Sequence, residues 1–214
     1  MLLDTIRNGF NGKWVDLVSG GPPCQSFSMA GLREKDSDKN TLPWEFASFV
    51  EHVQPKIAVL ENVTGILRAF KDKNDNLFHA WFEVAKVFAT KKYIPLCLHV
   101  NARFAGVPQN RPRFIMIAIR HDIFEELEKT FSTIDSELKL FKESKVFYQL
   151  VQKQPQEAIF GTLPYFDVTK DDNLSLFKTS FLHHLVGHTP VSVSEALDDL
   201  KMNKPSKSSF FVII

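Results

Sequence analysis

Cys24 is the first residue whose type and position suggest chemistry. It follows Gly20 to Pro23, two glycines and two prolines, at the point where the apolar run WVDLVS (residues 14–19) ends. These residues predict a stiff, bent backbone, and open α/β sheets place their reactive groups at such strand ends. A thiolate held there would be a candidate nucleophile. The second cysteine, Cys97, lies within the strand-like run PLCLHV, which predicts a small buried side chain.

A carboxylate and an amide close the next apolar run. Glu61 and Asn62 end KIAVLEN (residues 56–62), again at the carboxyl end of a predicted strand. Most carboxylates in such positions are merely solvated. Glu61 becomes a candidate for a functional role beside Cys24, because adjacent parallel strands would aim both side chains at the same crevice.

Arginines dominate a third segment. Residues 101–120 contain four of them and no acidic residue, which predicts a local cationic patch; they are Arg103, Arg111, Arg113 and Arg120. Alternation around Pro112 points Arg111 and Arg113 the same way, and guanidinium groups bind phosphates or carbonyl oxygens bidentately. Without the other two motifs, a solvated basic hairpin is an equally good interpretation.

Strands and helices that alternate along the chain would position these residues. The predicted strands cover residues 14–19, 56–62, 94–100 and 114–119. The predicted helices cover residues 41–54, 77–91 and 123–131, the second with Leu77, Trp81, Val84, Ala85 and Phe88 on one face. The alternation favours an open α/β sheet with a largely parallel core. Because the last two strands lack a helix between them, we expect an antiparallel pair that closes one edge of the sheet.

The pattern weakens beyond about residue 122. Residues 121–150 carry seven acidic side chains and four lysines, and residues 151–188 show no convincing period, which predicts an irregular segment or a small insertion. Ser192 and Glu195 form a capping box for a short helix, for which we expect Ala196, Leu197 and Leu200 to face inward. An apolar, strand-like tail, SSFFVII, ends the sequence.

Composition and charge exclude several classes of protein. The 214 residues leave room for one domain and an appendage, with 44% hydrophobic and 24% charged residues. These values exclude collagen-like, wholly disordered and disulfide-scaffold chains. A net charge of +1 gives no global field toward nucleic acid or membrane. No apolar run approaches the roughly 18 to 20 residues of a membrane helix, so we expect a soluble, unexported protein.

The three motifs, in this order, resemble those of the cytosine-5 DNA methyltransferases. VDLVSGGPPCQSFSMAG is similar to the nucleophile motif of that family, LENVTGIL to its Glu-Asn-Val motif, and AGVPQNRPRFIMIAIR to its Gln-x-Arg-x-Arg motif. PVSVSEALDDL is similar to the segment before the target-recognition region. The resemblance implies a partial Rossmann-like, adenosylmethionine-dependent methyltransferase sheet, mostly parallel with an antiparallel edge hairpin. It also implies that residues 1–122 are the central part of the catalytic domain, and residues 123–214 a variable insertion and a truncated lead-in to target recognition.

The resemblance further implies transfer of a methyl group from S-adenosylmethionine to carbon 5 of cytosine in double-stranded DNA, without a metal. Cys24 matches the nucleophile that attacks carbon 6. Glu61 would protonate or hydrogen-bond ring nitrogen 3 if burial raised its pKa, and Asn62 would orient that carboxyl group. Arg113 would hold the carbonyl oxygen of the ring, and Arg111 would support the hairpin or bind a phosphate.

The target nucleotide must leave the base stack, and the stretch Gln25 to Thr41 is suited to close over it. The residues expected to contact DNA are Gln25, Ser26, Ser28, Arg33 and Gln109. Pro23 and Leu42 are expected to line the cofactor site.

Parts of the family pattern are absent. Only 13 residues precede the first predicted strand, and they lack the Phe-x-Gly-x-Gly turn and the acidic residue that bind S-adenosylmethionine in the family. The later target-recognition segments are absent too. The expectation is therefore a fragment, a pseudogene product or a subunit of a split enzyme, completed by another subunit or by the missing segments.

Alternatives remain open at this point. They are an inactive DNA-binding remnant, a tRNA cytosine-5 methyltransferase, and a cysteine hydrolase that pairs Cys24 with a histidine. The cluster His183, His184 and His188 fits a polar loop better than a metal site. The family implies a restriction-modification or epigenetic role, in the bacterial cytoplasm at the nucleoid or in a eukaryotic nucleus.

Overall fold

The computed structural model describes five continuous segments of the chain and four isolated residues. They are residues 15–23, 42–71, 77–130, 138–170 and 188–200, with Thr5, Phe177, Leu182 and His183. Cys24 and the predicted closing loop lie outside the described residues, as do His184 and the SSFFVII tail.

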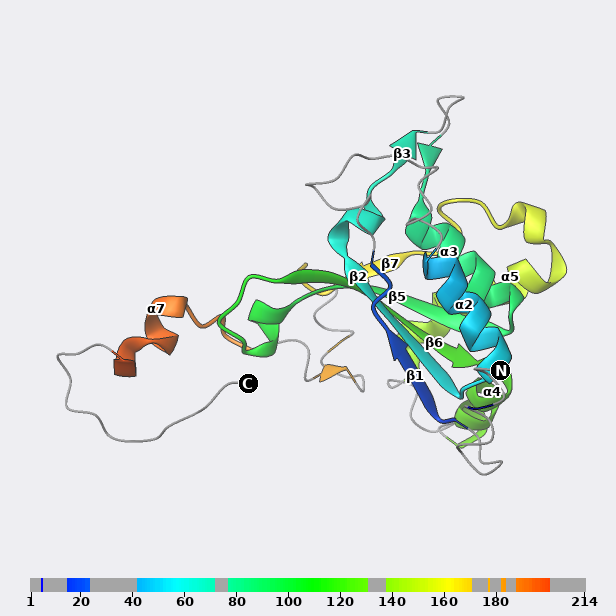
Figure 1. Ribbon diagram of the computed structural model, residues 1–214. Coiled ribbons are helices and arrows are strands. Elements are labelled where there is room, and N and C mark those ends of the chain that lie inside the picture. Colours follow the sequence, from blue (N-terminus) through cyan, green and yellow to red (C-terminus); the bar gives the residue numbers. More distant parts are fainter. Residues whose placement is uncertain are drawn as a thin grey trace.

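A five-stranded sheet with the order β1-β2-β6-β5-β7 forms the body of the molecule (Figure 1). Its strands are β1 (Leu17–Gly20), β2 (Ile57–Val63), β5 (Tyr93–Asn101), β6 (Pro112–Arg120) and β7 (Tyr165–Asp167). β1 pairs in parallel with β2, and β7 in parallel with β5, whereas β6 is antiparallel to both β2 and β5. Four strands therefore share one direction, which confirms the predicted mostly parallel sheet with one antiparallel hairpin.

The position of that hairpin differs from the prediction. β6 lies between β2 and β5, and β7 covers the outer side of β5, so the β5–β6 pair does not close an edge. β7 falls in the stretch that was expected to be irregular. Its three residues are too few to show a period-two pattern, and the strand exists through its pairing with Cys97 to His99.

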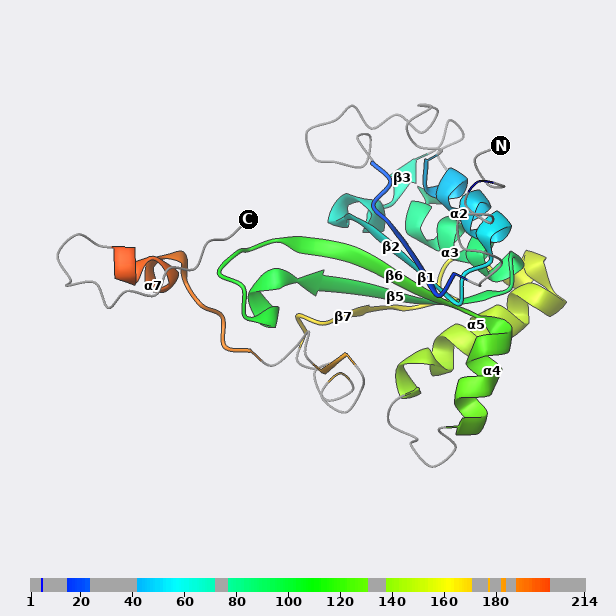
Figure 2. The same cartoon turned by 60° about the horizontal axis from the view of Figure 1, so that its bottom comes forward.

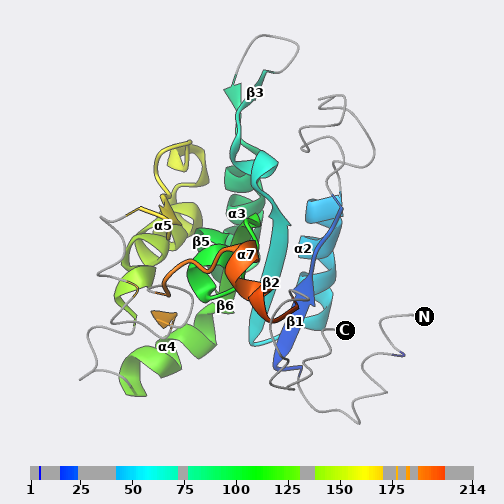
Figure 3. The ribbon, with the colours of Figure 1, turned by 90° about the vertical axis from the view of Figure 1, so that its left-hand side faces the viewer.

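Helices cover the sheet. They are α2 (Leu42–Val53), α3 (Ala80–Thr90), α4 (His121–Thr130) and α5 (Lys142–Lys153). α2 and α3 lie side by side (Figures 2 and 3). α5 packs against α3 and β5. α5 was not predicted, although Ser144, Phe147, Tyr148 and Val151 are buried at helical spacing. Short 3-10 turns complete the chain: η3 (Thr64–Leu67), η4 (Ala102–Ala105), η5 (Lys139–Phe141), η6 (Pro155–Glu157) and η8 (Asp198–Leu200).

The second predicted helix begins three residues later than expected. Leu77 belongs to β4 (Leu77–Phe78), which pairs with β3 (Phe70–Lys71), and its side chain is 65% exposed. From Ala80 onward the prediction holds, because Trp81, Val84, Ala85 and Phe88 are buried. Cys97 is buried as predicted, and this burial raises the pKa of its thiol.

The last described helix, α7 (Val193–Ala196), has the predicted capping box, in which Ser192 accepts from the backbone of Glu195 and Glu195 accepts from that of Ser192. The apolar residues that follow α7 do not face inward as expected. Leu197 is 49% and Leu200 71% exposed, because α7 lies away from the sheet (Figure 1).

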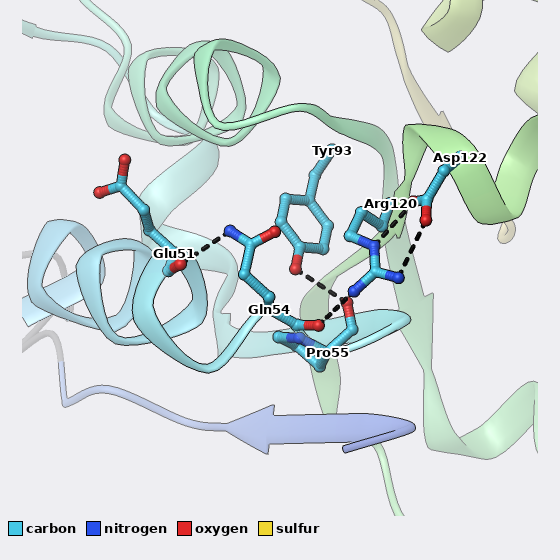
Figure 4. Close-up of polar contacts among 6 residues, drawn as sticks. All are labelled: Glu51, Gln54, Pro55, Tyr93, Arg120 and Asp122. Atoms are coloured by element: carbon cyan, nitrogen blue, oxygen red, sulfur yellow. Dashed lines mark hydrogen bonds and ion pairs between the residues drawn. The ribbon is translucent and has the colours of Figure 1, made fainter. Parts of the chain in front are cut away.

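A polar network joins the amino ends of β2 and β5 to the carboxyl end of β6 (Figure 4). The Tyr93 hydroxyl donates to the carbonyl of Pro55 at 2.8 Å, and burial raises the pKa of this phenol. The Arg120 guanidinium donates to the carbonyl of Gln54 and, from Nε, to Asp122 at 2.7 Å. Gln54 has a left-handed φ of 52°, which turns the chain from α2 toward β2. This end of the sheet is thereby fixed, and the candidate site lies at the opposite end.

Candidate active site

The carboxyl ends of β1 and β2 bring two of the three motifs together. Gly20 pairs with Leu60, so the next residues along the two strands, Gly21 and Glu61, are neighbours. A Cβ atom built at Gly21 would lie 3.2 Å from Oε2 of Glu61. The carboxylate of Glu61 therefore rests against the backbone three residues before Cys24.

Asn62 fastens the same loop. Its side chain is 3% exposed, and its Nδ2 donates to the carbonyl of Pro22 at 3.2 Å, while its Oδ1 accepts from the backbone of Val63 at 2.8 Å. The amide thus joins the end of β2 to the segment that leads into Cys24. Its predicted role in orienting Glu61 stays a prediction.

The third motif reaches the site from β6. Glu61 is opposite Ile115 and Val63 is opposite Arg113, so Arg113 is the diagonal neighbour of Glu61. Its Nε lies 2.6 Å from Oε1 of Glu61. Despite this distance the Nε–H is not aimed at the carboxylate and has no well-aligned acceptor among the described residues. The pair is thus an ion contact, while Nη1 of Arg113 donates to the carbonyl of Pro112 at 2.8 Å.

The degree of burial bears on the chemistry expected of this pair. The Arg113 side chain is 21% exposed and that of Glu61 is 43% exposed. The structure thus does not bury Glu61 as the predicted proton-donor role required, and pairs it with a guanidinium instead. The Glu61 side chain is thus partly accessible to an incoming ligand, whereas Nε of Arg113 is buried.

The other predicted site residues lie around this pair or outside the described residues. Gln109 and Arg111 are exposed in the loop that joins β5 to β6. Pro23 is exposed after β1, and Leu42 is half-buried at the start of α2. The residues outside the described part of the chain are Cys24, Gln25, Ser26, Ser28 and Arg33.

A glycine at the end of β1 allows a close approach to α2. A Cβ atom at Gly20 would lie 2.5 Å from the ring of Phe46, so only glycine allows β1 to approach α2 this closely. Leu42 precedes Phe46 by about one helical turn, on the side of the sheet's carboxyl edge. The expected role of Pro23 and Leu42 in lining the cofactor site stays a prediction.

A histidine–carboxylate pair lies near the same edge and was not foreseen. Nδ1 of His99 is 3.2 Å from Oδ1 of Asp167, which also accepts from the backbone and hydroxyl of Thr169 at 3.0 and 2.6 Å. Burial acts to raise the pKa of Asp167, but the hydrogen bonds from Thr169 and His99 outweigh it and hold the pKa below its usual range. The pair could not be predicted from the sequence, because Asp167 reaches His99 only through the pairing of β7 with β5.

His99 bears on the cysteine hydrolase alternative. β2 and β6 separate its strand from β1, and its ring is engaged by Asp167. Two strands therefore lie between His99 and the residues that follow β1.

The described residues show neither a metal-type cluster nor a membrane-spanning helix. No three of their His, Cys, Asp and Glu side chains are grouped as a metal site would need. None of the helices in this part of the chain has the length and apolar character to span a membrane.

Comparison with known proteins gives a consistent result. The family model for C-5 cytosine-specific DNA methylase matches residues 4–197. The chain is 38% identical over 108 residues to the type II methyltransferase M.DdeI of Desulfomicrobium norvegicum, covering 50% of this chain and 25% of that protein. It is 39% identical over 120 residues to the type II methyltransferase M.AquIA of a Picosynechococcus species, covering 55% of this chain and 46% of that protein.

A solved Escherichia coli prophage structure assigned as a DNA modification methyltransferase is 28% identical, with a TM-score of 0.44 over 56% of this chain and 31% of that one. The chain thus spans between a quarter and a half of the two curated relatives named above. Since the family model matches most of its residues, the chain belongs to the C-5 cytosine-specific DNA methylase family.

Proposed function

We propose that this chain transfers a methyl group from S-adenosylmethionine to carbon 5 of cytosine in double-stranded DNA, as part of a restriction-modification type system. The observation that carries the proposal is the contact of 2.6 Å between Glu61 and Arg113, beside the loop that leads into Cys24. Relatives named type II methyltransferases support DNA, rather than tRNA, as the substrate.

The paired side chains suit the edge of a cytosine ring. Ring nitrogen 3 and the carbonyl oxygen on carbon 2 are adjacent, so two neighbouring hydrogen-bonding groups can meet both. An incoming base would displace the ion contact, with the Glu61 carboxyl group on nitrogen 3 and the Arg113 guanidinium on the oxygen. Removal of water by the base would provide the burial that Glu61 lacks without a ligand.

Cys24 would supply the nucleophile. Its thiolate adds to carbon 6, the electron density moves toward nitrogen 3, and Glu61 stabilises it there by donating a proton or a hydrogen bond. Carbon 5 then becomes nucleophilic. S-adenosylmethionine supplies the methyl group, and Pro23 and Leu42 would line its site. Loss of the carbon 5 proton to water and departure of the thiolate restore the aromatic ring.

The DNA must present the base outside the duplex, because carbon 6 cannot be reached in a stacked helix. The residues proposed to contact the DNA are Gln25, Ser26, Ser28, Arg33 and Gln109. A second partner is proposed as well: a complementary polypeptide or further chain segments that complete the cofactor site.

A methyl-transfer assay tests this function. The chain, alone and with the neighbouring reading frames co-expressed, is incubated with radiolabelled S-adenosylmethionine and either duplex DNA or tRNA. We expect label in DNA, read as 5-methylcytosine after nucleoside digestion, and none from Cys24→Ser. Cys97→Ala is the matched control and should retain activity, since Cys97 is buried in β5. Label in tRNA alone, or activity that survives Cys24→Ser, would contradict the proposal.

A further inference from the structure

Residues 101–111, the last residue of β5 and the loop that joins it to β6, project past the ends of β1 and β2 (Figure 2). We call this segment the hairpin tip. It carries Arg103 and Arg111, both exposed, and the sequence from 101 to 120 contains no acidic residue. Neither arginine forms an ion pair with another residue in the described segments. The tip therefore offers two cations that no described carboxylate neutralises.

One side chain holds the two arginines in place. Oδ1 of Asn101 accepts from the backbone N–H groups of both Arg103 and Arg111, each at 3.2 Å. Nδ2 of Asn101 donates to Oδ1 of Asn110 at 2.8 Å. A single amide thus fastens both arms of the tip, and the backbone bond from Ala102 to the carbonyl of Arg111 closes it.

The tip is ordered in two further ways. The guanidinium of Arg103 lies over the ring of Phe104, 5.1 Å from its centroid, a contact that restricts a long side chain. Gly106, with φ of 82°, ends η4, and a Cβ atom there would lie 3.5 Å from the ring of His188. The backbone of His188 also donates to the carbonyl of Phe104 at 3.4 Å. The arginines are therefore presented on a preorganised turn.

We propose that the hairpin tip binds the DNA backbone beside the target base, with phosphates on Arg103 and Arg111, and that Asn101 is the positioning residue that sets their spacing. The inference rests on the proposed function, because it assumes a DNA substrate. Residues two apart in an extended chain are roughly 7 Å apart, so Arg111 meets the backbone of the nucleotide whose base meets Arg113. Exposed guanidinium groups on a rigid turn suit phosphate oxygens.

The salt dependence of DNA binding tests this inference. Binding of the full chain to a fluorescent duplex is measured by anisotropy over a range of KCl concentrations. The slope of log K against log [salt] is negative, and each lost phosphate contact reduces its magnitude by about 0.9. We expect that change from Arg103→Gln and from Arg111→Gln. Asn101→Ala should also reduce the magnitude of the slope although both arginines remain, because their shared anchor is gone.

Asn110→Ala is the matched control. It removes only the bond between the two asparagine side chains and leaves Oδ1 of Asn101 bonded to both backbone amides. Its slope should equal that of the wild type. A double-mutant cycle adds a positioning readout: in the Asn101→Ala background, Arg103→Gln should cost less binding than in the wild type. Thermal unfolding of each variant confirms that it is folded.

The outcomes separate the two proposals. If the wild type binds duplex DNA but both arginine variants keep its slope, the tip does not contact phosphates and the inference is wrong. If Asn101→Ala lowers only the melting temperature, and Arg103→Gln costs the same with and without it, Asn101 has no positioning role. If the wild type does not bind duplex DNA at all, alone or with the neighbouring reading frames co-expressed, the proposed DNA substrate is refuted as well.

Discussion

Replacing Asn62 by alanine is predicted to lower the free energy of unfolding by about 2 kcal/mol. Asn62 is 3% exposed, and its amide donates to the carbonyl of Pro22 and accepts from the backbone of Val63. Alanine removes both bonds and leaves two backbone groups without their partner, for which the usual cost is about 1–3 kcal/mol. The anchor of the loop that leads into Cys24 is lost with them.

Two assays measure the effect of Asn62→Ala. Urea denaturation gives the stability difference, and the rate of methyl transfer reports the loop. We expect both to fall for Asn62→Ala. Asn110→Ala removes an exposed asparagine bond and should change stability by less than about 0.5 kcal/mol. If Asn62→Ala matched the wild type in both assays, Asn62 would not anchor the loop and the reasoning would be refuted.

Asn62→Asp sharpens the test through pH. The introduced carboxylate keeps an acceptor for Val63 but turns a negative oxygen toward the Pro22 carbonyl, and only its protonated form can donate there. Burial and this repulsion raise its pKa above the unfolded value of about 3.9. The variant should therefore approach wild-type stability as the pH falls, and lose stability as the pH rises through the raised value. A stability difference independent of pH would oppose this account.

Four further substitutions test the rest of the structure. Glu61→Gln and Arg113→Met should each slow methyl transfer by about 100- to 10,000-fold, read as kcat, with small effects on melting temperature because both side chains are partly exposed. Tyr93→Phe should lower the free energy of unfolding in urea by about 1–3 kcal/mol, because the carbonyl of Pro55 loses its donor. The pKa of Asp167 is lowered from 3.8, so its carboxylate should stabilise the fold above about pH 4, and this stability should be lost as the pH falls through the pKa of the folded state. The free energy of unfolding in urea should therefore differ less between pH 5 and pH 3 in Asp167→Asn than in the wild type.

Each of these has an opposing result. Unchanged kcat in both Glu61→Gln and Arg113→Met would remove the pair from the chemistry. Full stability of Tyr93→Phe would mean that the bond to Pro55 adds nothing to the fixed end of the sheet. An equal acid dependence in the wild type and Asp167→Asn would show that other carboxylates govern that range.

The sheet could be predicted in large part because its strands are strong local patterns. β2, β5 and β6 are apolar runs bounded by loops, and α2 has the expected proline stop after Val53. α5 and β7 were missed for different reasons. The buried face of α5 includes the polar Ser144 while the apolar Val146 is exposed, which weakens its helical period. β7 is too short to have a period and is defined by its partner strand.

Of the candidate site, the sequence could predict only that the ends of neighbouring strands bring certain residues together. Parallel strands bring Gly21 and Glu61 to one edge, which follows from the order of the motifs. The contact between Glu61 and Arg113 depends on the register of β6, and a shift of one residue would turn Arg113 to the other face. The partner of Asn62 is a backbone carbonyl 40 residues away, and backbone carbonyls carry no sequence signature.

A covalent trap tests the central claim, that Cys24 attacks a base held by Glu61 and Arg113. The chain, with the neighbouring reading frames supplied in a parallel arm, is mixed with S-adenosylmethionine and duplexes that contain 5-fluorocytosine, then run on a denaturing gel. Fluorine blocks the final proton loss, so a working site stays attached to the DNA. We predict a shifted band that persists in Cys97→Ala and disappears in Cys24→Ser. A shifted band in Cys24→Ser, or none from the wild type in either arm, would contradict the account.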